Sequence, residues 1–171
     1  MSNQKILLGN HPILLDVRPD RLDLRDFPYR PPVENLPAVF PSLLQVQTLL
    51  PEYVRAGRIL DQGSEGACTG FGLAAVINYL QWIRALDSAQ EAPGLVSPRM
   101  LYHLAKLYDE WPGEDYEGSS CRGALRGWQR HGVCLESLWP YNRGTFQRPK
   151  AGWDTDAAAR PLGVYYRIQP D

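Results

Sequence analysis

The fold is decided by the loop Gln62-Gly63-Ser64-Glu65-Gly66-Ala67-Cys68 and the apolar segment from Phe71 to Ile83. Glycine and serine make the loop flexible, and apolar side chains then cover most of the circumference of a predicted helix. Only Asn78, Gln81 and Arg84 recur at a spacing of three, as a thin polar stripe. A helix that is apolar nearly all round is a buried one, so we expect a central buried helix that starts at Cys68.

The position of Cys68 at a helix start has a chemical consequence. The positive end of the helix dipole and the free N–H groups of the first turn favour a thiolate, the nucleophilic form of cysteine. The alternative is a small buried core residue, which is common for a free cysteine. Gln62 favours the nucleophile, because its amide could donate to an oxyanion together with the backbone N–H of Cys68. We therefore assign Cys68 as candidate nucleophile and Gln62 as candidate oxyanion-hole donor.

The run from Gln62 to Phe71 resembles papain-like (C1 family) cysteine peptidases of bacterial type, which carry Gln-Gly-Ser-x-Gly-x-Cys-x-x-Phe before a central helix. The Gln-to-Cys spacing is intact. Thr69 stands where the family usually has an aromatic residue, and Glu65 where it usually has a disulfide cysteine. The resemblance implies an α+β papain-like fold, mainly its helical half with only the start of the β-rich half. It also implies hydrolysis of a peptide or protein substrate through a thioester on Cys68, with no cofactor.

Two further helices are predicted after the central one. Ser97 is an N-cap candidate before Pro98, and apolar residues at helical spacing continue to about Tyr108. A third helix is capped by Ser119 or Ser120 and runs to about His131, with a glycine as its stop. These elements occur in the same order in the papain-like family.

Four substrate-binding residues are implied by the resemblance. They are Gly118, Ser119, Ser120 and Cys121. The first two would form the wall along which an extended substrate backbone pairs, and the other two would lie near the pocket for the residue two before the scissile bond. The alternative for Cys121 is a helix-start residue without a role in binding.

Composition limits the other functions that the chain could have. A length of 171 residues predicts one domain, and a net charge of −1 gives no argument for nucleic acid or an anionic membrane as partner. Three cysteines do not make a disulfide framework, and Cys121 and Cys134 flank a helix too long to bridge. The spacing of His131 and Cys134 lacks the second ligand pair of a structural zinc site, so we expect no metal. No signal peptide or membrane-spanning segment is evident, which predicts a cytoplasmic protein.

The chain divides into a Pro-rich leader at 1–58 and a papain-like peptidase domain at 59–171 that is incomplete at its C-terminus. Prolines at 28, 31 and 32 prevent a regular helix at 22–32, which we expect to run extended over a surface. A short helix or turn is predicted at 43–54, interrupted by Pro51, and a strand at 163–168.

A general base for Cys68 is not found by this reasoning. His103 and His131 lie on helices of the same half as the cysteine, and His11 lies in the leader. Three explanations remain open. The chain is a fragment of a full peptidase whose missing C-terminal half, on the same chain or on a second chain, supplies His and Asn. Or it is a catalytically inactive peptide-binding module. Or Cys68 belongs to another class of thiol enzyme, such as an NlpC-like hydrolase or an acyltransferase.

Overall fold

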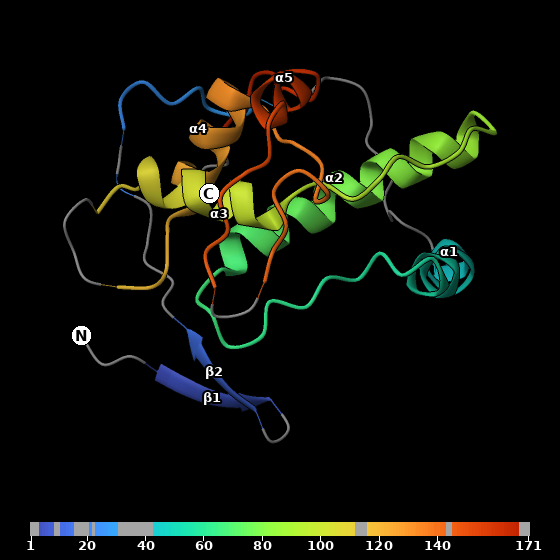
Figure 1. Ribbon diagram of the computed structural model, residues 1–171, viewed down its shortest axis with the longest axis horizontal. Helices are drawn as coiled ribbons and strands as arrows, with labels where there is room; N and C mark the ends of the chain where they lie inside the picture. Colours follow the sequence, from blue (N-terminus) through green and yellow to red (C-terminus); the bar gives the residue numbers. More distant parts are fainter. Residues whose placement is uncertain are drawn as a thin grey trace.

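The computed structural model describes residues 21, 23–30, 43–111, 116–142 and 145–167, and the backbone of two strands. These strands, β1 (Gln4–Leu8) and β2 (His11–Leu15), form an antiparallel hairpin in which Gln4 pairs with Leu15. Within the described part of the chain the helices are α1 (Leu43–Arg55), α2 (Cys68–Asp87), α3 (Pro98–Leu107), α4 (Cys121–His131) and α5 (Trp153–Ala158). Their arrangement is shown in Figure 1.

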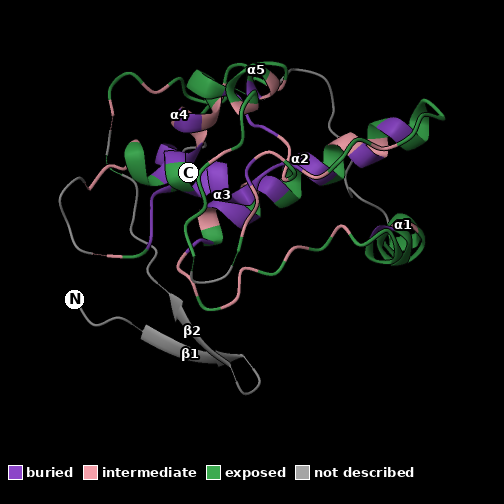
Figure 2. Ribbon diagram, viewed as in Figure 1, coloured by how far each residue is buried: buried purple, intermediate pink, exposed green. Residues whose placement is uncertain are grey.

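The core lies around α3, which packs against α2 on one side and α4 on the other (Figure 1). One apolar cluster joins α2 and α3 through Ala74, Ile77 and Leu101. A second joins α3 to the segment before α5 and to α5 itself, through Met100, Trp139 and Ala157. Buried residues therefore concentrate along α3 and the faces that meet it, as Figure 2 shows.

Gly70 allows α2 to approach α3 closely. A Cβ atom on this residue would lie 2.6 Å from the carbonyl oxygen of Pro98 and 2.7 Å from the Cβ of Tyr102. Contacts this short do not occur between real side chains, so only glycine fits between the two helices. The close approach fixes α2 two residues after Cys68, and so it fixes the start of the helix that carries the cysteine.

The predicted ends of α3 and α4 are confirmed. The Ser97 side chain accepts a hydrogen bond from the Met100 N–H at 3.0 Å, with Pro98 in the first turn. The Ser120 side chain accepts from the Gly123 N–H at 3.0 Å. α4 ends at Gly132, whose φ of +72° is accessible to glycine at low cost.

The expectation that α2 is buried all round is wrong. Asn78, predicted to lie on a polar stripe, is fully buried, and its side-chain oxygen accepts a hydrogen bond from the Val96 N–H at 2.9 Å. In contrast, 53% of Val76 and 47% of Leu80 are exposed. The apolar composition identified the helix but not the face that it buries, because Asn78 is hydrogen-bonded to the backbone of a distant segment.

Several elements differ from the sequence-based expectations. α1 continues through Pro51. Tyr53 of α1 packs on α2, with its ring centre 5.5 Å from that of Tyr79 and 5.2 Å from that of Trp82. The hairpin β1–β2 and helix α5 were not predicted. In place of the strand expected at 163–168, residues 163–167 form a single parallel bridge, between Pro28 and Arg167. Ile168 lies outside the described residues.

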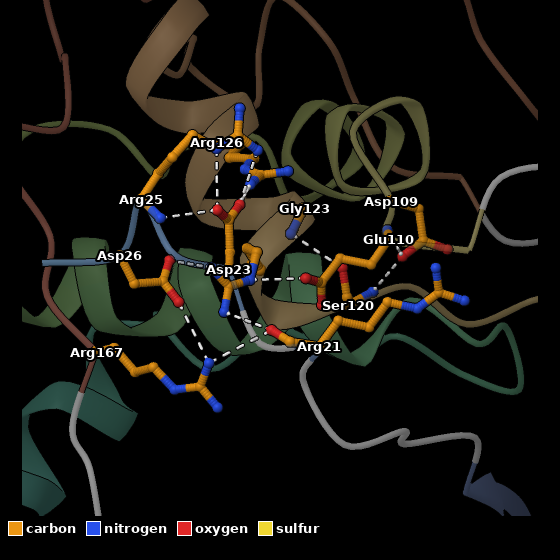
Figure 3. Close-up of polar contacts among 11 residues, drawn as sticks. Arg21, Asp23, Arg25, Asp26, Asp109, Glu110, Ser120, Gly123, Arg126 and Arg167 are labelled. Atoms are coloured by element: carbon orange, nitrogen blue, oxygen red, sulfur yellow. Dashed lines mark hydrogen bonds and ion pairs between the residues drawn. The ribbon is translucent and has the colours of Figure 1, made fainter. Parts of the chain in front are cut away.

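Residues 23–30 of the leader are docked against α4. Asp26 pairs with the buried guanidinium of Arg122 and, at 3.3 Å, with Arg167, while Asp23 pairs with Arg126 at 2.6 Å. In Figure 3 the labelled side chains of Asp23, Asp26, Arg126 and Arg167 come together from three segments that are far apart in the sequence. The extended course predicted for 22–32 is found only in part. The Asp26 N–H donates to the Asp23 carbonyl at 3.0 Å and closes a turn, Pro28 forms the bridge with Arg167, and residues 22, 31 and 32 lie outside the described residues.

No helix in the described residues is both long enough and apolar enough to cross a membrane.

Candidate active site

Cys68 is the first residue of α2, and its side chain is exposed. The residue before it, Ala67, has no side chain that can cap the helix, and the first turn holds no acidic residue. The first N–H groups of a helix have no partner within the helix, and here no capping side chain takes their place. The positive end of the α2 dipole is therefore directed at the thiol without a neighbouring carboxylate in that turn to offset it.

The loop before Cys68 is closed by hydrogen bonds around one carbonyl group. The carbonyl oxygen of Glu65 accepts from the side-chain amide of Gln62 at 3.2 Å and from the N–H of Ala67 at 2.7 Å. The N–H of Gly63 donates to the Asp61 carboxylate at 2.8 Å. These bonds hold the Gln62 amide on the loop that ends at Cys68, although neither residue's proposed role is tested by them.

The loop also packs against the segment that precedes α4. A Cβ on Gly66 would lie 2.9 Å from the Cβ of Glu117, so the two segments touch without room for a side chain at this position. The side chains of Thr69 and Ser119 are hydrogen-bonded, with their oxygens 2.5 Å apart. The structure thus brings the predicted wall residue Ser119 next to the residue that follows Cys68.

The other predicted substrate-binding residues are placed differently. Gly118 is buried, and Ser120 uses its hydroxyl to cap α4 while its N–H donates to Asp109 at 3.0 Å. Cys121 lines a cavity of about 670 Å³ between α4, the leader and residues 164–167. No disulfide involves it, Cys68 or Cys134. Binding of substrate by Gly118, Ser120 and Cys121 stays a prediction.

An ion pair next to the loop was not found by sequence reasoning. The Glu65 carboxylate accepts hydrogen bonds from both terminal nitrogens of Arg99, at 2.7 and 2.8 Å. Arg99 is only 4% exposed. The Arg99 guanidinium holds the pKa of Glu65 below its usual value. It also lies over the ring of Tyr141, 4.5 Å from the ring centre. No local pattern signals this pair, because 34 positions separate Glu65 from Arg99.

A cavity of about 510 Å³ adjoins the same loop. It is lined by Gln62, Ser64 and Glu65 from the loop, by Arg99 and Tyr102 from α3, and by Tyr141. His103 also lines it, and the His103 ring lies 5.3 Å from that of Trp139 and 5.7 Å from that of Phe146. Burial lowers the pKa of His103. Both charged and aromatic groups therefore face the space beside the loop that ends at Cys68.

Neither histidine with a described side chain is hydrogen-bonded to Cys68. The His103 ring packs at a tilted angle against the rings of Trp139 and Phe146, and His131 is hydrogen-bonded to Tyr108 at 2.7 Å. Within the part of the chain that the structure describes, no group of three or more His, Cys, Asp or Glu residues is placed to hold a metal ion. The described residues therefore present a candidate nucleophile and a candidate oxyanion donor, but no base in contact with the thiol.

No protein-family model matches the sequence, and neither does any curated protein. A search of solved structures finds xylellain, a cysteine protease from Xylella fastidiosa, with a TM-score of 0.62 and 23% sequence identity. The match covers 90% of this chain. The fold is that of a cysteine protease. The chain spans only 58% of the xylellain chain, so a large part of that protein has no counterpart here.

This cysteine-protease fold agrees with the mainly helical architecture of the described residues. At 23% identity the likeness supports the fold alone, and the chemistry must be argued from the site.

Proposed function

We propose that this chain is the helical half of a papain-like cysteine peptidase, with Cys68 as nucleophile. The observation that carries the proposal is the exposed Cys68 thiol at an uncapped helix start, on the same loop as the Gln62 amide. The thiolate would attack the carbonyl carbon of a peptide bond, and the collapse of the tetrahedral intermediate would release the amine and leave a thioester. Water would then hydrolyse the thioester to restore Cys68.

Gln62 is suited to the role of oxyanion donor by the bond that it already makes. A side-chain amide carries two N–H donors. One of them is used by the Glu65 carbonyl at 3.2 Å, which restricts the orientation of the amide. The other, with the backbone N–H of Cys68, is available to an oxyanion. Donors that are fixed in advance stabilise the developing charge without reorganisation during the reaction.

The base that this chemistry needs must come from outside the described residues. The start and middle of α2 carry an exposed surface against which a segment that contains this base could pack. Cys68, Gly72, Val76 and Leu80 follow one another at a spacing of four, which places them on one face of the helix, and all four are exposed. An exposed apolar stripe in line with a candidate nucleophile fits a polypeptide segment that covers α2 and brings His and Asn to Cys68. That segment is either a continuation of this chain or a second chain.

The test compares the 171-residue chain with the full product of its native gene. Both are assayed with a fluorogenic peptide mixture, and their intact masses are measured. We expect the 171-residue chain to show little or no turnover, and the full gene product, or its complex with a second chain, to show turnover that Cys68→Ala abolishes. Robust Cys68-dependent cleavage by the 171-residue chain alone would show that the base is already present.

The contacts of His103 and His131 favour a second candidate, an inactive peptide-binding module. In that case the full gene product would bind peptides without cleaving them, and Cys68→Ala would leave the affinity unchanged. Equilibrium binding of fluorescent peptides, measured beside the turnover assay on the same preparation, separates the two functions.

A further inference from the structure

The loop that carries Gln62 and Cys68 is tied to the core through a closed ring of side-chain contacts. Glu65 in the loop pairs with Arg99 on α3 through two short bonds, at 2.7 and 2.8 Å. The Arg99 guanidinium lies over the ring of Tyr141. The Tyr141 hydroxyl then returns to the loop and donates to the Gln62 carbonyl at 2.7 Å.

Each member of this ring is itself held firmly. Arg99 is nearly fully buried on α3, the helix at the centre of the core. The Tyr141 ring packs edge-on against Phe71 in the second turn of α2, with ring centres 4.7 Å apart. The Tyr141 N–H donates to the Glu136 carboxylate at 2.8 Å. A bidentate pair between a guanidinium and a carboxylate has a fixed planar geometry, so it sets the orientation of the loop as well as its distance from α3.

We propose that Arg99 and Tyr141 are positioning residues for the nucleophile loop: the Glu65–Arg99 ion pair, stacked on Tyr141, fixes the loop that presents the Gln62 amide and the Cys68 thiol. Glu65 occupies the position at which the resembled family usually has a disulfide cysteine. Here a charged pair links the loop to α3 without a covalent bond. The catalytic meaning of this positioning rests on the proposed peptidase function, but the restraint of the loop does not.

The restraint acts on the proposed oxyanion donor in two places. The carbonyl oxygen of Glu65 accepts a hydrogen bond from the Gln62 side-chain amide. The carbonyl oxygen of Gln62 accepts one from the Tyr141 hydroxyl. If the ion pair between Glu65 and Arg99 is broken, the loop backbone becomes free to move at Glu65, whose carbonyl orients the Gln62 amide. The loss of Glu65 also leaves the nearly buried Arg99 guanidinium without this partner and so lowers the stability of the fold, which makes a control for general destabilisation necessary.

The test measures loop order directly, by hydrogen exchange of peptides that cover 62–68, and thiol presentation, by the alkylation rate of Cys68 with iodoacetamide. The variants are Glu65→Gln, Arg99→Lys and Tyr141→Phe. Asp156→Asn is the control, because its carboxylate is about as exposed as that of Glu65 and it breaks an ion pair of 2.8 Å with Arg160, within and just after α5.

For Glu65→Gln we expect exchange in 62–68 to rise by about tenfold or more, the factor that corresponds to a lost charge-assisted hydrogen bond. We also expect the Cys68 alkylation rate to change. Tyr141→Phe, which keeps the ring and its packing, should raise exchange at the Gln62 end alone. Arg99→Lys keeps the charge and should retain part of the protection. Asp156→Asn should lower the thermal midpoint and leave both loop readouts unchanged.

Unchanged loop exchange and unchanged Cys68 alkylation in both Glu65→Gln and Tyr141→Phe would overturn the proposal. So would equal effects of Asp156→Asn, which would show a general loss of stability. Neither readout depends on turnover. If the full gene product proves inactive while the loop responds as expected, the peptidase function fails and the positioning inference stands. For an active full product, Arg99→Lys should lower kcat more than it raises KM, because it disturbs the presentation of the thiol and the oxyanion donor.

Discussion

Thr69 and Ser119 join the start of α2 to the segment before α4, with their hydroxyl oxygens 2.5 Å apart. Fifty positions separate the two residues in the sequence. Thr69 directly follows Cys68, and Ser119 is buried and directly precedes the cap of α4. The bond therefore sets the position of α2's first turn relative to the predicted wall of the substrate cleft.

The first prediction concerns this bond. Thr69→Val keeps the shape of the side chain and removes its hydroxyl, which leaves the buried Ser119 hydroxyl without this partner. We expect a loss of about 1 kcal/mol in the free energy of unfolding, measured by urea denaturation. Thr69→Ser keeps the hydroxyl and should retain the bond. In a double-mutant cycle with Ser119→Ala, fully additive effects would contradict a direct interaction.

The second prediction concerns thiol reactivity. Cys68 and Cys121 are both exposed and both begin a helix, but α4 is capped by the Ser120 side chain and α2 has no side-chain cap. We expect iodoacetamide to label Cys68 faster than Cys121 near neutral pH, because no side chain occupies the first N–H groups at the positive end of α2. Burial raises the pKa of Cys134 to about 11, so Cys134 should react only after unfolding.

Peptide mapping over a time course measures these rates. The same labelling in urea supplies the control, since all three thiols should then react at similar rates. Equal rates for Cys68 and Cys121 in the folded protein would show that the start of α2 does not activate its cysteine.

The parts of the fold that the sequence predicted well are those set by neighbouring residues. Ser97-Pro98 and Ser120 signal the starts of α3 and α4 through hydrogen bonds within three residues, and Gly132 signals the end of α4. The loop and helix around Cys68 follow the same local rules. The sequence Gly9-Asn10 between two apolar runs is a hairpin signal that could have revealed β1 and β2.

Features that depend on distant partners were beyond local reasoning. Asn78 is buried because it binds the backbone of Val96, 18 positions away. The Glu65–Arg99 pair and the contacts of Asp26 with α4 likewise join segments whose approach only the folded chain reveals. The candidate site was therefore predictable in its nucleophile loop, and the side chains that hold that loop in place were not.

The third prediction concerns the docked leader. Arg122 is only 4% exposed and pairs with Asp26 and, at 2.7 Å, with Glu110. Asp26→Asn removes one of the two negative charges that stabilise this buried cation. We expect a loss of about 1.5–3 kcal/mol in the free energy of unfolding, the range for a hydrogen bond to a charged group. Arg25→Ala, which removes the solvated Arg25–Asp23 pair, is the control and should lower the free energy of unfolding less than Asp26→Asn does.

The pH dependence of the Asp26→Asn effect gives a second measurement. The hydrogen-bonded guanidinium of Arg122 lowers the pKa of Asp26. The stability that ionised Asp26 contributes is therefore present above the ordinary Asp value of 3.8 and is lost as the pH falls through the lowered pKa. The difference between wild type and Asp26→Asn should shrink in acid. A difference no larger than that of Arg25→Ala at neutral pH would show that the leader is not held by this pair.

The fourth prediction concerns Glu136, which lies behind Tyr141. Burial raises the pKa of Glu136, so the folded protein favours its neutral form and ionisation costs stability as the pH rises above the ordinary Glu value of 4.5. Its Oε1 accepts from the Tyr141 N–H at 2.8 Å, while Oε2 is buried without a hydrogen-bond partner among the described residues. Glu136→Gln can keep the accepted bond and removes the charge. We therefore expect it to raise the urea midpoint at pH 7 and to give no such gain at pH 4.

Glu136→Leu separates the charge from the hydrogen bond. Leucine also removes the charge, but it leaves the Tyr141 N–H without its acceptor, at a cost of about 1–3 kcal/mol if that group stays buried. Glu136→Leu should therefore be less stable than Glu136→Gln at both pH values. If the midpoint of Glu136→Gln relative to wild type is the same at pH 4 and pH 7, the buried carboxylate carries no ionisation cost. The support that Glu136 gives to Tyr141 would then come from the hydrogen bond alone.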